Sequence, residues 1–397
     1  MIRKKLLMLN ASEHEIPFIL AARSLGFYVV TTSTKSEYEG HRYADEYIYG
    51  NYNDYDEMIE LCRREGIEAI SQACTDDCAL SAAYIGEKMG FKGHDTFENA
   101  CIIHRKDRFK EFCRKNNVIS PLSEAFTDIE EALRYSEKCV FPVIVKPTDL
   151  AGGIGISVAE NEKEYRDVVM GAFAKSHEKH IVVEPYIVGK QHSLSTFIVD
   201  RKVVAYATED DHSSFNKYMV NQGIWNASDW EKAEPVIIPE VERIARILNL
   251  VDGNLHMQYI QDSSGKPWII EMMRRNIGNN NMMAMSNCYG LNWAEWIIRA
   301  EAGMDCHNIP RRCTPQGYCG YYMAMSPRDG VFDHLEIEPE FRKYVYQTYL
   351  WRESGHEITN HLLEKMGSVL FRFESEAEKL RYEDRIDEMI HVVLKDK

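Results

Sequence analysis

The first hundred residues alternate between short apolar segments and longer amphipathic segments, and this alternation constrains the fold more than any other feature. The apolar segments KKLLMLN, FYVVTTS and EAISQAC have the length and composition of buried strands. The amphipathic segments carry apolar residues at helical spacing, and two of them stop at Gly26 and Gly90. Strands joined by helices of this length form βαβ units, so the sequence predicts a parallel α/β domain over residues 1–100.

Polar residues follow the predicted strands of this domain, at the edge where parallel sheets bind their ligands. The loop after the first strand has no Gly-x-Gly-x-x-Gly, which disfavours a dinucleotide site and an NAD-type dehydrogenase. Acidic residues at this edge suit either a cationic amine or the capping of a helix. These acidic candidates are Glu13, Asp76 and Asp77. We expect His14 and His212 to be solvated loop histidines rather than ligands.

The next unit begins with the basic helix KDRFKEFCRKNN. A capping box at Thr127 and Glu130 is predicted to start another helix. The buried strand PVIVKP then leads into a glycine-rich loop over residues 149–157, and Asn161 and Glu164 cap the helix after it. HIVVEPYIVG is predicted to be a strand followed by a connector.

The second half of the chain is less regular. Residues 193–208 have a strand pattern, whereas residues 209–235 show no period, so we expect a binding loop or lid there. Pro239 is predicted to open a helix, and two strands around the turn at residues 262–266 form a predicted β-hairpin. The last ninety residues are predicted to hold a short strand GYYMAM, an irregular middle, a strand SVLFRF and a helix capped by Ser375 and Glu378.

Charge and composition exclude several classes of protein. The chain carries 62 acidic and 47 basic residues, a formal charge of −15, which disfavours broad binding to nucleic acid or to an anionic membrane. No apolar window is long enough for a membrane span, and the apolar run LLML near the N-terminus is too short for a signal peptide. The ten cysteines form no Cys-x-x-Cys, so we expect reduced, mostly buried thiols. These features predict a cytoplasmic protein of two or three domains.

The glycine-rich loop is a candidate anion site. Gly152, Gly153 and Gly155 permit a backbone that wraps closely around an anion and points its N–H groups inward, although a tight hairpin would use the same glycines. Lys146 lies at the end of the preceding apolar strand, where an ammonium group needs an anionic partner. That partner is either a neighbouring carboxylate or a phosphate, and the sequence leaves both open.

The connector and the hairpin are the other candidate sites. The connector after Glu184 offers backbone groups that suit an adenine edge, or it links two domains. The hairpin turn places Gln258 opposite Glu271 and His256 opposite Met273, within one register. A polar pair inside an apolar hairpin indicates a lined site, although a solvated hairpin face would also carry one. The basic residues that follow suit an anionic substrate.

The order of these features resembles the ATP-grasp superfamily, and within it the carboxylate–amine ligases related to biotin carboxylase and the L-amino-acid ligases. The resemblance covers nearly the whole chain, from the βαβ domain to the hairpin and the arginine after it. It implies an α/β and α+β protein: an N-terminal parallel-sheet (pre-ATP-grasp) domain, an ATP-grasp fold with two α+β subdomains, and a C-terminal closing segment. The implied boundaries are 1–100, 101–300 with a lid subdomain at about 118–184, and 301–397.

The resemblance also implies roles for single residues, matched by position. Those implied to bind ATP phosphates are Lys106, Lys146, Gly152, Gly153 and Gly155. Those implied to form the adenine hinge and the ribose position are Glu184, Pro185, Tyr186, Ile187 and Gln191. Glu271, with Gln258, is implied to bind magnesium, and Arg275 is implied to steady the substrate carboxylate or acyl phosphate.

Two of the three magnesium ligands that the resemblance implies are altered in this chain. Gln258 stands where the hairpin usually supplies a glutamate, and Met273 stands where an asparagine is usual. A Gln carbonyl can bind Mg²⁺ with less charge, whereas a Met thioether is a poor ligand. Asn276, Asn279 and Asn280 follow in the loop and are candidates to compensate. The implied cofactors are ATP and Mg²⁺, or Mn²⁺ in its place.

The resemblance implies an ATP-dependent ligase that joins a carboxylate to an amine through an acyl phosphate and releases ADP and phosphate. The alternative is an ATP-binding homologue with a degraded metal site that acts as a non-catalytic regulator or subunit. The implied partners are a small-molecule carboxylate and a small-molecule amine, with no nucleic acid and no membrane. Relatives are often dimers, which leaves a homodimer open.

Overall fold

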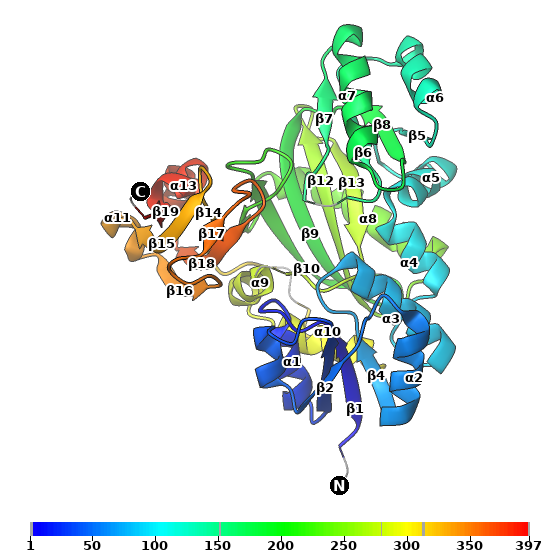
Figure 1. Cartoon of the computed structure of the whole chain (residues 1–397), viewed down its shortest axis with the longest axis vertical. Helices are drawn as coiled ribbons and strands as arrows, with labels where there is room; N and C mark the ends of the chain where they lie inside the picture. The colour runs from blue at the N-terminus through cyan, green and yellow to red at the C-terminus, as the bar shows by residue number, and fades with distance from the viewer. Residues whose placement is uncertain (1–2, 151, 279, 312–313, 396–397) are drawn as a thin grey trace.

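The N-terminal domain is a parallel sheet flanked by helices, as the sequence predicts (Figure 1). The computed structural model describes residues 3–150, 152–278, 280–311 and 314–395. The strand order is β3-β2-β1-β4, with bounds β1 (Lys5–Leu9), β2 (Tyr28–Ser33), β3 (Glu46–Tyr49) and β4 (Ile67–Ser71). The helices are α1 (Ile16–Ser24), α2 (Tyr55–Glu65) and α3 (Asp76–Met89). Thr75 caps α3, because its side chain accepts the Cys78 N–H at 3.2 Å.

A small antiparallel sheet lies at the far end of the molecule from the N-terminal domain (Figure 1). It follows α4 (Phe97–His104) and α5 (Lys106–Asn116). Its order is β5-β8-β6-β7, with bounds β5 (Glu124–Phe126), β6 (Val143–Pro147), β7 (Ser157–Ala159) and β8 (Ile181–Pro185). The helices α6 (Ile129–Arg134) and α7 (Glu162–Lys175) cover one face and share an apolar core with it. We call this unit, residues 124–185, the cover unit.

The two predicted caps in the cover unit have different outcomes. Asn161 caps α7 as predicted, since its side chain accepts the N–H groups of Lys163 and Glu164. The prediction for α6 was wrong by one residue, because Asp128 and not Thr127 is the cap. Asp128 Oδ1 accepts the Glu131 N–H at 2.9 Å, and aspartate is the stronger N-cap residue of the two.

An eight-stranded sheet forms the centre of the molecule, in the order β13-β12-β9-β10-β11-β14-β18-β16. The bounds are β9 (Gly189–Val199), β10 (Lys202–His212), β11 (Gln222–Trp225), β12 (Gly253–Asp262), β13 (Pro267–Met273), β14 (Tyr318–Met325), β16 (Val345–Leu350) and β18 (Lys365–Phe373). Because β14, β18 and β16 continue the sheet from β11, the predicted closing segment shares one sheet with the middle of the chain.

Residues 209–235 are not the structureless stretch that the sequence predicts. β10 continues to His212, β11 pairs with it, and α8 (Trp230–Ile247) begins well before Pro239. Pro235 and Pro239 therefore lie inside α8. The helix is not interrupted at these prolines, because its apolar face is buried on both sides of them and packs in one core with β12. The residues of this face include Ala233, Ile237, Val241, Ile244 and Ala245.

The C-terminal segment predicted as irregular contains strands. β15 (Gly330–Ile337) pairs with β17 (Glu357–Ile358) and β19 (Ile390–Leu394), while β16 pairs with β18. β16 is mostly exposed and β15 fully buries only Phe332, so their sequences carry little apolar alternation. The predicted helix is present as α12 (Glu376–Tyr382), capped by Ser375. The other helices are α9 (Asn281–Tyr289), α10 (Trp293–Glu301), α11 (Pro339–Arg342) and α13 (Ile386–Met389).

The predicted hairpin is formed by β12 and β13, and its predicted register is confirmed. Gln258 pairs with Glu271, and His256 pairs with Met273. One pair further on, Tyr259 pairs with Ile269, so the residue between Ile269 and Glu271 has no partner. This is a β-bulge directly before Glu271, and bulges are frequent beside binding sites because they redirect side chains.

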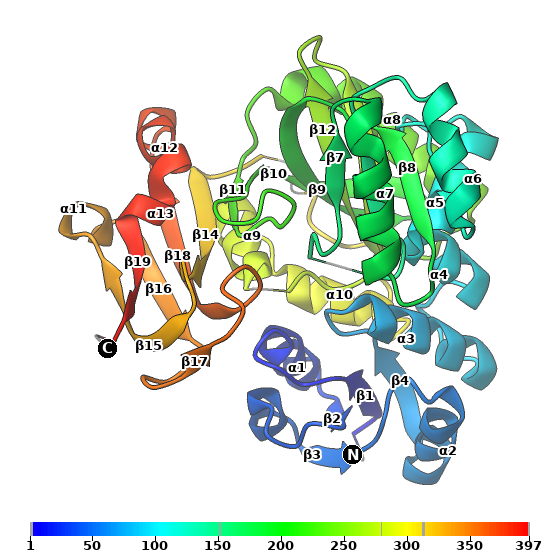
Figure 2. The ribbon, with the colours of Figure 1, turned by 45° about the horizontal axis from the view of Figure 1, so that its top comes forward.

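The cysteines within the described ranges are free thiols, and all of them except Cys139 are buried. Burial raises the pKa of Cys62 to about 12, so this thiol is protonated at neutral pH. No helix in the same ranges is long and apolar enough to cross a membrane. Figure 2 shows β14, β18 and β16 beyond β11, at the end of the central sheet away from the cover unit.

Candidate functional site

A cavity of about 650 Å³ lies where the cover unit, α4, α5 and the central sheet meet. Its walls bring together residues that are far apart in the sequence, from Asp76 of α3 to Asp384 after α12. All the residues to which the resemblance assigns a role, except Gly155, line it. They are Lys106, Lys146, Gly152, Gly153, Glu184, Pro185, Tyr186, Ile187, Gln191, Gln258, Glu271 and Arg275. Of the acidic candidates in the N-terminal domain, Asp76 lines the cavity, whereas Glu13 and Asp77 do not.

Two lysines on the cavity wall share one buried carboxylate. Lys146 Nζ contacts Glu184 Oε1, and Lys110 Nζ lies 2.7 Å from Glu184 Oε2. Burial alone would raise the pKa of Glu184, but the two ammonium groups outweigh burial and lower the pKa to about 2. The partner of Lys146 in this structure is therefore the neighbouring carboxylate. Glu184 holds the two ammonium groups side by side at the cavity wall.

Lys110 was missed by the sequence reasoning. It lies one turn after Lys106 on α5, among the buried residues Phe109, Phe112 and Cys113. A lysine on the apolar face of an amphipathic helix was the available signal, because such a group needs a buried anion. Its ammonium group also donates to Ser120 Oγ at 3.0 Å, which fixes its direction.

The glycine-rich loop has a backbone that other residues adopt with strain. Gly152, Gly153 and Gly155 all have positive φ, at 64°, 77° and 76°. A Cβ on Gly153 would lie 2.8 Å from Tyr218 Cβ, so the loop fits closely against the segment after β10. Lys106 Nζ donates to the carbonyl of Leu150 at 2.8 Å, which ties α5 to the start of the loop.

Gly155 lies outside the cavity, because its place is set by a contact within the cover unit. A Cβ there would lie 2.7 Å from Pro147 Cγ, at the end of β6.

The loop between β10 and β11, residues 213–221, reaches the glycine loop, since Asn216 Nδ2 donates to the Gly152 carbonyl at 3.4 Å. Lys217 and Tyr218 of the same loop line the cavity.

The connector after β8 leaves only part of its backbone for a ligand. The Tyr186 N–H donates to the Pro142 carbonyl at 3.0 Å, so this group holds β8 against the start of β6. Pro185 has no N–H. A base edge in this part of the cavity would therefore be recognised by the carbonyl groups of the connector and by N–H groups after Tyr186.

Gln258 and Glu271 lie at the floor of the cavity together with a second acidic residue, Asp211 of β10. Asp211 Oδ2 accepts from Ser193 Oγ at 2.8 Å and from Gln191 Nε2 at 3.4 Å. Burial raises the pKa of Asp211 to about 7 despite these two donors, and the neighbouring carboxylates of Asp210 and Glu271 add to the rise. Within the described ranges no three His, Cys, Asp or Glu side chains form a ready metal cluster.

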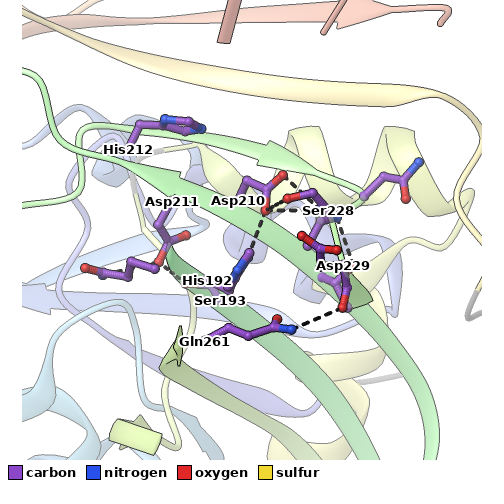
Figure 3. Close-up of polar contacts among 12 residues, drawn as sticks. His192, Ser193, Asp210, Asp211, His212, Ser228, Asp229 and Gln261 are labelled. Atoms are coloured by element: carbon purple, nitrogen blue, oxygen red, sulfur yellow. Dashed lines mark hydrogen bonds and ion pairs between the residues drawn. The ribbon is translucent and has the colours of Figure 1, made fainter. Parts of the chain in front are cut away.

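The neighbouring Asp210 has a full set of partners (Figure 3). His192 Nδ1 lies 2.8 Å from Asp210 Oδ1, and the Ser228 N–H donates to both carboxylate oxygens. Lys379 Nζ of α12 contacts Asp210 Oδ2, so the C-terminal segment is tied to the middle of the central sheet. Burial would raise the pKa of Asp210, but His192 and Lys379 lower it well below its usual range.

Arg275 is held from the N-terminal domain. Its Nε donates to Asp76 Oδ1 at 2.8 Å. His104 Nδ1 lies 2.9 Å from the same oxygen, while His104 Nε2 accepts the Arg274 N–H at 3.3 Å, so Nδ1 carries the proton. Burial would raise the pKa of Asp76, but Arg275 and His104 lower it strongly. Asp76 is thus a positioning group in the first turn of α3, and it does not cap that helix.

The histidines expected to be solvated are not. His14 packs against the Trp351 ring at 5.0 Å, and burial lowers its pKa to about 4. His212 lines the cavity, 3.6 Å from Asp384, and burial lowers its pKa as well. Both loops are covered by the C-terminal segment, which the local sequence does not reveal.

The loop after the hairpin was a candidate source of metal ligands. Asn276 is fully buried, and neither side-chain atom has a hydrogen-bond partner among the described residues. Asn280 precedes α9, and Asn279 lies outside the described residues. Neither Asn276 nor Asn280 lines the cavity, whereas Met273 does.

Comparison with known proteins agrees with the resemblance. A family model described as "Phosphoribosylglycinamide synthetase, ATP-grasp (A) domain" matches residues 105–218. The phosphoribosylamine–glycine ligase of Vibrio cholerae is 28% identical over 178 residues, which are 41% of this chain and 42% of the relative. That of Listeria monocytogenes is 29% identical over 131 residues, 32% of this chain and 31% of the relative. The chain thus spans less than half the length of the curated relatives that it matches.

Solved structures match over the whole chain. The L-amino acid ligase from Bacillus licheniformis has a TM-score of 0.84 at 18% identity, covering 100% of both chains. The phosphoribosylglycinamide synthetase from Anaerococcus prevotii has a TM-score of 0.77 at 20% identity, covering 99% of this chain and 100% of that one. The biotin carboxylase domain of the Hydrogenobacter thermophilus 2-oxoglutarate carboxylase has a TM-score of 0.76 at 19% identity, covering 99% and 91%. The predicted fold class and the predicted resemblance are both confirmed.

Proposed function

We propose that this chain, which has the ATP-grasp fold, is an ATP-dependent ligase that joins a small-molecule carboxylate to a small-molecule amine. The observation that carries the proposal is the cavity, in which Lys106, Lys146, Glu271 and Arg275 meet from separate elements. The whole-chain likeness to an L-amino acid ligase and a phosphoribosylglycinamide synthetase supports the same reaction class. The substrates themselves are left open.

The cationic wall suits the phosphates of ATP. Lys146 and Lys110 share the single negative charge of Glu184, so the three groups together carry a net positive charge at the wall. The glycine loop adds backbone N–H groups, and Lys106 fixes the start of that loop. The connector that follows Glu184 also lines the cavity, where it would take the base.

The floor suits a divalent cation held by oxygen ligands. Glu271 and the side-chain carbonyl of Gln258 lie on paired residues of β12 and β13, and both line the cavity. Mg²⁺, or Mn²⁺ in its place, would neutralise phosphate charge and hold the γ-phosphate for in-line attack. Asp211 Oδ1, a buried carboxylate oxygen without a partner among the described residues, also fits such a cation.

The reaction divides into two displacements. A carboxylate oxygen of the substrate attacks the γ-phosphorus, and the bond to the β–γ bridging oxygen breaks to release ADP. The amine then attacks the acyl carbon, phosphate leaves with the bonding electron pair, and the amine loses a proton to give the amide. Arg275, oriented by Asp76, is placed to hold the carboxylate or acyl-phosphate oxygens. The glycine loop and residues 213–221 would exclude water, which hydrolyses acyl phosphates.

The second candidate is an ATP-binding homologue that does not ligate and serves as a regulator or subunit. Gln258 and Met273 favour it, because they replace ligands that the resemblance implies, and no described cluster of three carboxylate, thiol or imidazole groups makes up for them. The proposed setting in both cases is the cytoplasm. Assembly as a homodimer stays open.

Hydroxylamine trapping separates the two candidates. Purified protein would be incubated with MgATP, hydroxylamine and pools of carboxylic acids, because hydroxylamine replaces the amine and converts an acyl phosphate to a stable hydroxamate. A ligase gives hydroxamate and ADP in equal amounts with at least one pool, and Glu271→Gln abolishes both. ATP binding without hydroxamate or ADP in any pool favours the regulator.

A further inference from the structure

A row of polar side chains crosses the cavity floor from one strand to the next. Glu271 of β13 pairs with Gln258 of β12, and Gln258 pairs with Ser193 of β9. Ser193 Oγ donates to Asp211 Oδ2 of β10 at 2.8 Å. On β10 the residue paired with Ser193 is Glu209, and Asp211 lies two residues further along the strand on the same face. Glu271 and Asp211 therefore lie on either side of Gln258 and Ser193. Glu271, Gln258 and Asp211 all line the cavity.

Asp211 has an oxygen that the protein does not satisfy. Oδ2 takes both hydrogen bonds, from Ser193 and Gln191, whereas Oδ1 is buried and has no partner among the described residues. An unpaired buried carboxylate oxygen costs free energy, so native proteins nearly always supply a donor or a cation for it. The unpaired oxygen of Asp211 therefore indicates a ligand that the protein chain does not provide.

The adjacent Asp210 shows which partners a buried structural carboxylate has in this part of the sheet. It has a cation from Lys379, a contact from His192 and donors from Ser228 (Figure 3). Asp211 has no ion pair with a lysine or arginine in the described part of the chain, and the charged groups that act on it most strongly are the carboxylates of Asp210 and Glu271. A cation between Asp211 and Glu271 would remove their mutual repulsion.

We propose that Asp211 is a ligand of the divalent cation and supplies the second carboxylate that Gln258 does not. Together with Glu271 and the Gln258 carbonyl, it would offer a set of hard oxygen ligands of the kind that Mg²⁺ and Mn²⁺ prefer. The second negative charge that balances the metal ion then comes from Asp211 on β10, and not from the Gln258 position on β12. This inference rests on the proposed ATP-dependent function and names one more residue of the same site.

The test measures metal binding directly rather than activity. Mn²⁺ would be titrated into the full-length protein saturated with ADP, and free Mn²⁺ would be counted by electron paramagnetic resonance. The affinity of ADP itself would be measured by calorimetry in EDTA. The variants are Asp211→Asn, Asp211→Asn with Gln258→Glu, and Asp200→Asn. Asp200 is the matched control, because it is an exposed aspartate in the turn between the same strands, β9 and β10.

We expect Asp211→Asn to weaken Mn²⁺ binding roughly tenfold or more, while ADP affinity in EDTA stays the same. Adding Gln258→Glu to that variant should recover most of the loss, because it returns a carboxylate to the row. Asp200→Asn should behave as the wild type. This rescue distinguishes the loss of a metal ligand from a structural disruption of the cavity floor, because a second substitution would not restore a disrupted structure.

Several results would overturn the proposal. One is Mn²⁺ affinity unchanged in Asp211→Asn, which is also the result expected if Asp211 served only as a proton acceptor. Another is an equal loss of ADP affinity in EDTA, which would make Asp211 a structural residue. Wild-type protein that binds ADP but no Mn²⁺ would refute the metal site and leave nucleotide binding standing. Failure to bind ADP at all would refute the proposed function, and this inference with it.

Discussion

Lys110 and Glu184 form an ion pair in which both side chains are almost fully buried, with Nζ 2.7 Å from Oε2. Lys146 contacts the second oxygen of the same carboxylate. Burial lowers the pKa of Lys110, and the Glu184 carboxylate opposes that lowering. The cationic wall of the cavity therefore depends on a residue that contributes negative charge.

Glu184→Gln should destabilise the protein and weaken ATP binding together. Removing one partner of a buried charge pair typically costs about 3–5 kcal/mol, because the remaining charges lose their compensation. Melting temperature and ATP affinity by calorimetry measure the two effects. Glu124→Gln is the control, because Glu124 is exposed on β5 beside the same strand, and its change should stay within about 0.5 kcal/mol. An unchanged melting temperature in Glu184→Gln would refute the claim.

Gly153→Ala should weaken ATP binding with little loss of global stability. Its φ of 77° and the 2.8 Å approach of a Cβ to Tyr218 would force the glycine loop out of its place. Gly171→Ala is the matched control within α7, where a Cβ meets nothing within 4 Å. It should stabilise the protein by about 0.5–1 kcal/mol and leave ATP affinity unchanged. Equal ATP affinities in the two variants would contradict the role given to the loop.

Asp76→Asn should affect the carboxylate substrate more than ATP. The substitution removes the charge that orients Arg275 and His104, whereas Lys110 and Lys146 are held by Glu184 and are untouched. We expect the KM for the carboxylate to rise about tenfold, as a lost charge-assisted hydrogen bond implies, while the KM for ATP changes less than twofold. Steady-state phosphate release under varied concentrations of each substrate provides both values. A larger change for ATP would argue against this placement.

Glu301 predicts a pH dependence of stability. It lies at the end of α10, where Ser71 Oγ donates to its Oε2 at 2.5 Å, and burial raises its pKa to about 7. Between its ordinary pKa near 4.5 and about 7, the folded protein binds a proton that the unfolded chain has released, so stability falls as pH rises through this window. Glu301→Gln should lose less melting temperature between pH 5 and pH 8 than the wild type. Glu295→Gln, on the same helix, should keep the wild-type slope.

The parts of the site that local sequence determines were predictable. A turn centred at residues 262–266 fixes the pairing of the strands beside it, so Gln258 could be placed opposite Glu271 before the fold was known. The positive φ of Gly152 and Gly153 likewise follows from residue type. These features are determined by the backbone geometry of a few consecutive residues, so the sequence alone predicts them.

The missed parts depend on partners distant in sequence. The run Glu209, Asp210 and Asp211 lacks an apolar period, because its side chains meet Asn281, Lys379 and Ser193 inside the protein. The end of β10, from Glu209 to His212, therefore resembled a loop. The start of α8 was misplaced for a related reason, since a continuous buried face outweighs the usual effect of proline on a helix.

The contact between Lys379 and Asp210 bears on how the chain is synthesised. The cavity wall includes Glu383 and Asp384, and α12 is fastened to β10 by that contact. A ribosome releases the N-terminal sheet, the cover unit and the hairpin long before these residues emerge. Throughout that interval Asp210 has no lysine to neutralise it, so the nascent polypeptide holds an incomplete pocket until translation has passed residue 384.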